Sequence, residues 1–315
     1  MTVLDADVPA RVLAVYAHPD DPEISAGGTL ARWADLGAEV HIAVTTRGDK
    51  GTSDPDANLE ELVKVRIEET DAAARVLGVS AHHHLDHPDG ELDDDRALRL
   101  ELVRLLRRLR PDAVCCPDPT AVFFGDAYVN HRDHRITGWA TIDGVLPAAG
   151  NPHYFPELRA EGLDVHNVRT LYLSGTFEPN VWIDISATLE RKIEALFCHA
   201  SQLVETGDWF REYLRESAVE AGRIAEVQYA EAFRRISLGY FHRRGRGAWP
   251  RQSDWARSTR MAIVAAPIAA RIVPTTAAPS SFSAHDGMDA LKPSTCASRR
   301  SARFGESGHE VATRP

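Results

Sequence analysis

The chain has 315 residues, of which 43% are hydrophobic and 26% are charged, and its formal net charge is -10. A chain of this length can bury one sizeable core, either alone or with a small appendage. The acidic balance disfavours a nucleic-acid binder, and the longest apolar run, Met261 to Ala270, is too short for insertion into a membrane, which takes about 20 residues.

Strands and helices alternate along the first part of the chain. Short apolar runs predict strands, apolar residues at helical spacing predict helices, and Gly78 stands at a typical helix C-cap position. Strands are predicted at 11–17, 39–45, 82–85 and 113–116, and helices around 29–35, at 59–77 and at 95–109. This order implies parallel strands joined by right-handed crossovers. We therefore predict an α/β fold, a three-layer sandwich with a Rossmann-like, mostly parallel sheet and helices on both faces.

The second part of the chain continues with less regular elements and then changes in composition. Strands are predicted at 168–174 and 181–185, and helices at 187–203 and about 209–235. Residues 242–315 contain 12 Lys and Arg against 5 Asp and Glu, and they show no amphipathic period. We predict a globular domain over 1–241 and a disordered basic tail over 242–315. The tail has two alternative interpretations: it is a basic arm that binds an acidic partner, or it is an extension without a selected role.

The cysteines indicate the compartment. The chain has four, of which Cys115 and Cys116 are neighbours, and none forms a CxxC pair. This pattern argues against a disulfide framework and against a thiolate zinc cluster. Together with an acidic start that lacks the features of a secretory signal, it predicts a cytoplasmic protein. The oligomeric state, a homo-oligomer included, is left open.

Two polar motifs carry the candidate chemistry. AHPDDPE, residues 17–23, directly follows the first predicted strand, and NHRDHRITG occupies residues 130–138. In parallel sheets, ligands bind outside the carboxyl ends of the strands. Asn130 suits a helix N-cap, which would place His131 and His134 on one face of the first turn. A His, an Asp and a His from two loops match a catalytic zinc site, which keeps one position open, and the remaining carboxylate and imidazole are acid and base candidates.

These motifs, with three others, resemble those of the PIG-L, or LmbE-like, family of zinc-dependent N-deacetylases. The resemblance is carried by AHPDDPEISAGGTLARW (17–33), TTRGDKG (45–51), Arg66-x-x-Glu69 leading to Leu77-Gly78, PDGEL (88–92) and NHRDH (130–134). It spans about residues 10 to 238 in the same motif order. The tail has no counterpart in the family.

The resemblance implies a metal site and a general base. In the family's first motif the His and the second Asp bind the metal, here His18 and Asp21, and the last His of the second motif, here His134, is the third ligand. Asp20 is then the general base. Zinc is implied at one ion per chain, although two imidazoles and one carboxylate also accept Fe(II), Co(II) or Mn(II).

The resemblance also implies roles around the metal. His131 corresponds to a candidate acid and oxyanion partner, and Asp133 is expected to hold an imidazole. Arg66 and Asp89 resemble positions that face the substrate, and the alternatives are a helix salt bridge and a turn Asp. Tyr128 could donate a hydrogen bond to the oxyanion.

The implied activity is metal-dependent hydrolysis that removes an N-acetyl group from an N-acetylglucosamine-type substrate. That small-molecule sugar could be a glycoside, a thiol precursor, a glycolipid or a secondary metabolite. An amidase for thiol conjugates and a non-catalytic metal- or sugar-binding protein are the alternatives. A dinucleotide-binding domain is disfavoured, because the first strand is followed by two carboxylates in place of GxGxxG.

A run of histidines, His82 to His84 with His87, invites a second metal site. Because neighbouring side chains of a strand point to opposite faces, these imidazoles cannot all converge, and a second site is not predicted. The HASQ segment, 199–202, is expected to cap a helix or to fill the core.

Overall fold

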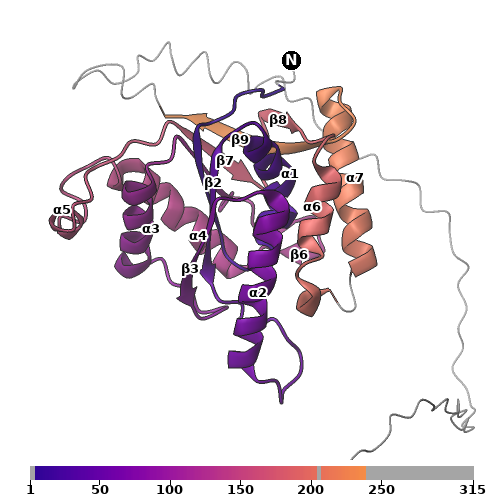
Figure 1. Ribbon diagram of the computed structural model, residues 1–315, viewed down its shortest axis with the longest axis horizontal. Coiled ribbons are helices and arrows are strands. Elements are labelled where there is room, and N and C mark those ends of the chain that lie inside the picture. Colours follow the sequence, from indigo (N-terminus) through magenta and orange to yellow (C-terminus); the bar gives the residue numbers. More distant parts are fainter. Residues whose placement is uncertain (1–3, 204–206, 239–315) are drawn as a thin grey trace, which may run out of the picture. The chain divides into compact units, whose positions relative to one another are not determined.

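A computed structural model describes residues 4–203 and 207–238 and shows a seven-stranded sheet between two layers of helices (Figure 1). The strand order is β3-β2-β1-β4-β7-β9-β8. The first five of these strands pair in parallel, and β9 pairs antiparallel with both β7 and β8. The strands are β1 (Arg11–Tyr16), β2 (Glu39–Thr46), β3 (Ala81–His87), β4 (Ala113–Pro117), β7 (Thr170–Ser174), β8 (Val181–Asp184) and β9 (Ala230–Ser237). The prediction of a mostly parallel α/β sandwich is confirmed.

The helices cover both faces of this sheet. In Figure 1, α3 and α4 lie on one side, and α1, α2, α6 and α7 lie on the other. The helices are α1 (Asp21–Asp35), α2 (Leu59–Leu77), α3 (Arg96–Leu109), α4 (Arg132–Asp143), α5 (Glu157–Ala160), α6 (Leu189–Leu196) and α7 (Gly207–Ala225). A two-stranded hairpin, β5 (Phe123–Phe124) with β6 (Tyr128–Val129), precedes α4. Within the described ranges, no helix combines the length and the apolar character needed to cross a membrane.

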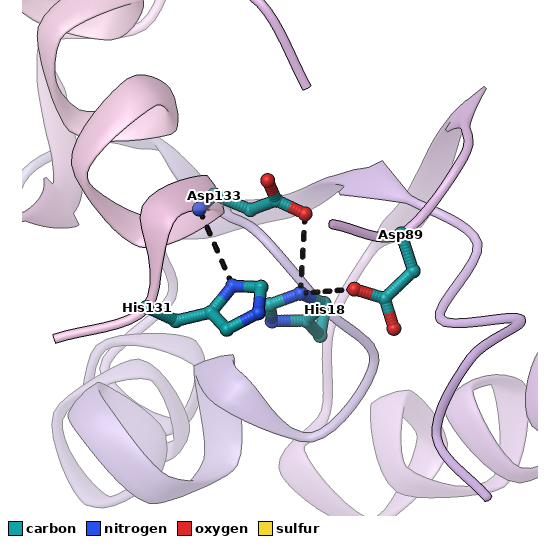
Figure 2. A group of neighbouring side chains, drawn as sticks. All are labelled: His18, Asp89, His131 and Asp133. Atoms are coloured by element: carbon teal, nitrogen blue, oxygen red, sulfur yellow. Dashed lines mark hydrogen bonds and ion pairs between the residues drawn. The ribbon is translucent and has the colours of Figure 1, made fainter. Parts of the chain in front are cut away.

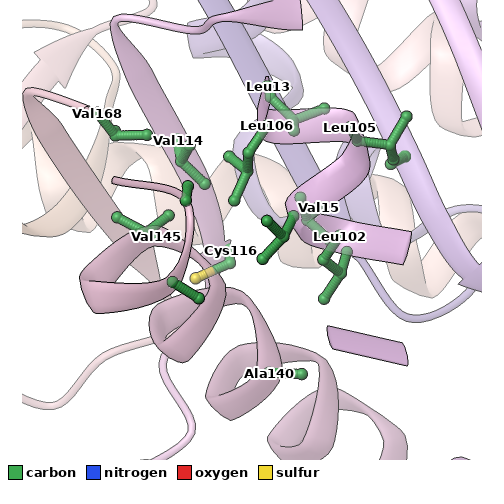
Figure 3. Close-up of a cluster of buried hydrophobic side chains, with 14 of the residues drawn as sticks. Leu13, Val15, Leu102, Leu105, Leu106, Val114, Cys116, Ala140, Val145 and Val168 are labelled. Carbon is green, nitrogen blue, oxygen red and sulfur yellow. The ribbon is translucent and has the colours of Figure 1, made fainter. Parts of the chain in front are cut away.

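The central strand β1 is buried on both faces, as a three-layer fold requires. Leu13 and Val15 point to the face covered by α3, where Leu102 and Leu106 pack against them (Figure 3). The alternate residues of β1 join the second core cluster, which includes Trp33 of α1 and covers the opposite face. Two apolar faces on one short strand explain why its sequence is an unbroken apolar run rather than an alternating one.

The helices predicted at 59–77 and 95–109 are confirmed, and local capping defines their ends. The side chain of Asn58 accepts a hydrogen bond from the backbone N–H of Glu61 at 3.3 Å, and α2 ends at Gly78 with φ 77°. A left-handed residue at this position is accessible to glycine at little cost. The carboxylate of Asp95 accepts from the backbone N–H of Leu98 at 2.9 Å and starts α3.

Two helix predictions in the second part of the chain were wrong in extent. The helix predicted over 187–203 is shorter, because α6 ends at Leu196 and a separate 3-10 turn follows at Ala200–Gln202. The helix predicted up to residue 235 ends at Ala225, and the chain turns at Glu226 with φ 59°. The following residues form β9, whose backbone pairs with strands on both sides and whose Phe233 is fully buried. This pairing is non-local, so helical spacing in the sequence could not reveal it.

The described cysteines Cys115, Cys116 and Cys198 are free thiols, and the first two are buried in β4, which agrees with the argument against a disulfide framework. The predictions for the tail at 242–315 lie outside the described residues.

Candidate active site

Polar side chains from three loops meet at the carboxyl edge of the sheet. His18 follows β1, Asp89 follows β3, and His131, Asp133 and His134 belong to the start of α4. Figure 2 shows His131, Asp133 and Asp89 arranged around His18. The predicted convergence of the two motifs at this edge is confirmed, because ring centroids of His18 and His134 lie 5.1 Å apart.

The chain enters α1 through a strained residue. Asp20 has φ 97° and ψ -30°, which is uncommon for a residue other than glycine and carries a cost of about 1–3 kcal/mol. Arg66 holds this turn, because its Nη2 donates to the backbone oxygen of Pro19 at 2.7 Å and to Oδ2 of Asp20 at 3.1 Å. Its Nη1 donates to the backbone oxygen of Gly48 at 2.8 Å. A nearly buried guanidinium thus connects the loops after β1 and β2.

His18, Asp21 and His134 face one another in a triangle of three side chains, in which each carboxylate oxygen of Asp21 faces one of the two imidazoles. Nδ1 of His18 lies 3.2 Å from Nε2 of His134 and 3.3 Å from Oδ2 of Asp21. Nε2 of His134 lies 3.2 Å from Oδ1 of Asp21. Metal–ligand bonds of about 2.0–2.1 Å in tetrahedral geometry place ligand atoms about 3.3 Å apart. The three side chains therefore fit a single tetrahedral ion with one position left for a ligand from outside the chain.

Each imidazole of this triangle also has a partner for its second ring nitrogen. Nε2 of His18 lies 3.0 Å from Oδ1 of Asp89 and 3.5 Å from Oδ2 of Asp133 (Figure 2). Nδ1 of His134 lies 2.9 Å from Oδ1 of Asn130. Metal-binding histidines typically donate this second N–H to a carboxylate, a carbonyl or water, which fixes the ring and its tautomer.

A second group of four side chains, His18, Asp89, His131 and Asp133, is also close enough to hold an ion. In that group His18 would coordinate through Nε2 and lose its hydrogen bond to Asp89. In the triangle with Asp21 and His134, His18 would coordinate through Nδ1, and its Nε2–H would keep its hydrogen bond to Asp89. We therefore favour the triangle as the metal site.

The N-cap prediction for Asn130 was wrong. The N-cap of α4 is His131, whose Nδ1 accepts from the backbone N–H of Asp133 at 3.3 Å. Asn130 is buried with its Nδ2 donating to the backbone oxygen of Ala121 at 2.8 Å, and its Oδ1 faces His134. The amide is therefore committed to holding the ring of His134, which lies in the first turn as predicted.

The two neighbouring carboxylates of the first motif have opposite electrostatic environments. Burial raises the pKa of Asp20 to about 6, although the positive charge of Arg66 opposes this effect. Burial also acts to raise the pKa of Asp21, but His134 and His18 beside it hold the pKa well below its usual range. For His131, burial lowers the pKa, and the neighbouring His18 lowers it further. Such divergence between adjacent carboxyl groups is typical of sites where one binds and the other exchanges protons.

The three residues predicted to contact the substrate differ in their burial and in their contacts. Arg66 is 3% exposed, and the hydrogen bonds of its guanidinium go to the chain itself. Asp89 lies against His18. Tyr128 is 51% exposed on the β5–β6 hairpin. Contact of these side chains with a substrate stays a prediction.

Several hydrogen bonds and buried side chains support the site in ways that the sequence did not indicate. The backbone N–H of Asp89 donates to Oδ1 of Asp49 at 2.9 Å, and that of Gly90 donates to Oδ2 of Asp133 at 2.6 Å. His199, expected in a cap or the core, is fully buried with Nε2 3.4 Å from Oε2 of the buried Glu23. The contact between Asn130 and His134 has one signal in the sequence, because residues four apart lie close together at the start of a helix.

Comparison with known proteins agrees with this geometry. The PIG-L family model, described as GlcNAc-PI de-N-acetylase, matches residues 13–145. A diacetylchitobiose deacetylase of Thermococcus kodakarensis is 35% identical over 233 residues, which cover 74% of this chain and 85% of that protein. A 1D-myo-inositol 2-acetamido-2-deoxy-alpha-D-glucopyranoside deacetylase of Acidothermus cellulolyticus is 33% identical, covering 63% of this chain and 82% of that protein.

A solved structure supports the same relationship. The N,N'-diacetylchitobiose deacetylase of Pyrococcus horikoshii, determined with its inhibitor MPG, superimposes with a TM-score of 0.68 at 33% identity. The match covers 75% of this chain and 89% of that one. The motifs, the fold and these relatives lead to one conclusion: the chain belongs to the PIG-L family of deacetylases.

Proposed function

We propose that this protein is a metal-dependent N-deacetylase that hydrolyses the acetamido group of an N-acetylglucosamine-type sugar. The observation that carries the proposal is the triangle of His18, Asp21 and His134, with Asp20 held beside it at the start of α1. The named relatives act on acetamido sugars, and they favour deacetylation over the thiol-conjugate amidase.

We assign the ligand set to Nδ1 of His18, a carboxylate oxygen of Asp21 and Nε2 of His134, with one zinc ion at this site. The same donors accept Fe(II), Co(II) or Mn(II). When bound, the ion supplies Lewis acidity, which lowers the pKa of a coordinated water and polarises the carbonyl of the substrate amide.

We assign the role of general base to Asp20. Arg66 holds its Oδ2 at 3.1 Å, and no hydrogen bond to Oδ1 is found among the described residues. A carboxylate whose pKa lies near 6 is ionised at neutral pH and still basic enough to accept a proton from the attacking water. The new C–O bond forms as this proton moves to Asp20.

His131 is positioned to stabilise the developing negative charge. Because its Nδ1 accepts from the backbone N–H of Asp133, its ring proton lies on Nε2 and is available as a hydrogen-bond donor. The carbonyl oxygen of the substrate becomes negative as the water attacks, and a donor placed there lowers the barrier. When the C–N bond breaks, acetate forms and the leaving amine takes up the proton that Asp20 accepted from the water.

Three further assignments belong to this proposal. Arg66 of α2, Asp89 of the loop after β3 and Tyr128 of the β5–β6 hairpin are candidate contacts for the sugar. A cytoplasmic location rests on the cysteine usage of the chain. The globular domain at 1–241 would carry the whole activity.

The test is amine release by the metal-loaded full chain from N-acetylglucosamine, N,N'-diacetylchitobiose and an N-acetylglucosaminyl-inositol. We expect release from at least one sugar, its loss with a chelator, and its recovery when zinc is returned. A protein that loses a bound zinc in His134→Ala, and so holds zinc at this site, but releases amine from none of these sugars would overturn the proposal. Release that is insensitive to complete metal removal would overturn the metal assignment.

A further inference from the structure

A second group of metal-ligating side chains lies away from the active site, where α2 packs beside the edge strand β3. His82 and His84 belong to β3, and Asp71 belongs to α2. Nδ1 of His82 lies 3.0 Å from Nε2 of His84, and one carboxylate oxygen of Asp71 lies within 4.8 Å of a ring nitrogen of each histidine. None of these residues takes part in the proposed catalytic machinery.

The alternation of the strand explains why two histidines converge here and the third does not. His82 and His84 are two residues apart in β3, and their ring centroids are 4.3 Å apart. His83 pairs instead with His41 of β2, with its Nε2 3.3 Å from Nδ1 of that residue. The expectation that the whole histidine run cannot share a point therefore holds. The third ligand comes from α2, which the sequence of the run could not indicate.

The charge of this group favours the binding of a cation. Burial and the neighbouring imidazoles lower the pKa of His82 to about 3, and burial lowers the pKa of His84 although Asp71 opposes this effect. Both rings are therefore neutral at pH 7 and offer a lone pair, while Asp71 is exposed and supplies a negative charge. The buried Nε2 of His82 has no hydrogen-bond partner in the described part of the chain, and the other ring nitrogen, Nδ1, is hydrogen-bonded to His84.

We propose that Asp71, His82 and His84 bind a divalent late transition-metal ion of the Zn2+ class and thereby link α2 to the edge strand β3. The spacing of 3.0 Å between the two imidazole nitrogens is within a few tenths of the ~3.3 Å expected around tetrahedral zinc. Imidazole and carboxylate ligands suit this class of ion. Water would complete the coordination, because Asp71 lies at the surface.

An ion at this site would stabilise two elements, α2 and β3, that hold residues of the proposed active site. α2 also carries Arg66, which holds the turn at Asp20, and β3 leads directly into the loop of Asp89. An ion that binds only the folded arrangement of α2 and β3 stabilises it by mass action. The proposal goes beyond the deacetylase activity and does not depend on it.

The test uses the metal-stripped full chain in the His134→Ala background, which removes one ligand of the proposed catalytic site. Zinc is titrated calorimetrically, and the melting temperature is followed in parallel. We expect a bound zinc whose affinity falls by at least 10-fold in His82→Ala/His84→Ala and in Asp71→Asn, but is unchanged in His83→Ala, the matched neighbour on the opposite face. Zinc at about 100 times its Kd should raise the melting temperature by about 5–10 °C, and the double variant should lose this rise.

Two results would overturn the proposal. One is zinc binding that is unaffected by His82→Ala/His84→Ala, which would place the ion elsewhere in the chain. The other is an equal loss in His83→Ala, which would indicate a general effect of the strand. Circular dichroism of the metal-free variants shows whether each is folded. Asp71→Asn changes an exposed residue of α2, so its zinc affinity tests the site without any change in β3.

Discussion

Asp20 and Asp21 are neighbours in the chain, yet the fold gives their carboxylates different tasks. Asp21 is the first residue of α1, and its side chain turns back to accept from the backbone N–H of His18 at 2.8 Å and to face both imidazoles. Asp20 is turned the other way by its positive φ and meets Arg66. One strained residue therefore separates the proposed ligand from the proposed base.

Replacing Asp20 by Asn tests this separation. We expect kcat for sugar deacetylation to fall by about 10²–10⁴-fold, because the amide cannot accept the proton from water. Zinc content should be unchanged, since the ligand triangle is intact. Activity assays and metal analysis on the same sample check both expectations. A near-normal kcat would contradict the role of Asp20, and loss of zinc would show that Asp20 contributes to binding the ion.

Asn130 acts on the metal site through His134. Its Oδ1 accepts from the second ring nitrogen of His134, so Asn130→Ala should loosen the ring and weaken zinc binding by about 10–100-fold. Asn130→Asp keeps an acceptor oxygen and should bind zinc more tightly than Asn130→Ala. Competition with a chelator measures these affinities.

A matched control for Asn130 is available in Asn180. The amide of Asn180 bonds the backbone of Arg235 in a different part of the sheet, so Asn180→Ala also removes amide hydrogen bonds to the backbone, at an exposed position away from the proposed metal site. Its zinc affinity should be that of the unmodified chain. Equal weakening in both alanine variants would argue for a general loss of structure.

At the scale of elements, the site depends on how closely α4 approaches β4. Gly138 lies in α4 against the end of β4, where an added Cβ would stand 2.6 Å from the backbone oxygen of Pro117 and 2.9 Å from the ring of Pro119. These atoms cannot move aside easily, because one is backbone and the other belongs to a rigid ring. The glycine therefore allows α4 to carry His131 and His134 to the sheet edge.

Gly138→Ala should destabilise the fold and displace the start of α4. We expect a loss of about 1–3 kcal/mol in the free energy of unfolding, from the overpacking of a close contact, together with weaker zinc binding. Gly144→Ala is the control, since its Cβ would meet Leu106 at an ordinary 3.5 Å and its backbone is already helical. Urea unfolding of the two variants distinguishes them, and similar stabilities would contradict the packing argument.

At the scale of the whole molecule, the two cores on either side of the sheet hold the strand ends in register. Leu102 of α3 is 1% exposed in the cluster that contains Leu13 and Val15. This cluster fixes the face of β1 opposite α1, and so it supports the loop that begins at His18.

Leu102→Ala should cost about 2–5 kcal/mol in the free energy of unfolding, because a buried side chain is replaced by a cavity. Leu36→Ala is the control, since Leu36 is 54% exposed and its truncation should change stability little. Chemical denaturation of the metal-free proteins measures both. A Leu102→Ala protein as stable as the control would show that this core relaxes around the lost volume.

The sequence by itself determined the elements whose signals are local. Gly78 ends α2, the apolar run of β1 indicates a strand, and the two motifs, through their resemblance to the PIG-L family, indicate the proposed ligands His18, Asp21 and His134. These signals depend on residue type and spacing, which the sequence displays directly.

Only the tertiary structure decided the features that depend on contacts between distant segments. The strand β9 forms because β7 and β8 stand on either side of it, although its residues have helical spacing. Asn130 serves His134 rather than the helix N-terminus, because Ala121 holds its amide. Asp71 meets His82 and His84 because α2 packs beside β3. The free energy of each arrangement comes from partners far away in the chain, and no local pattern records where those partners will lie.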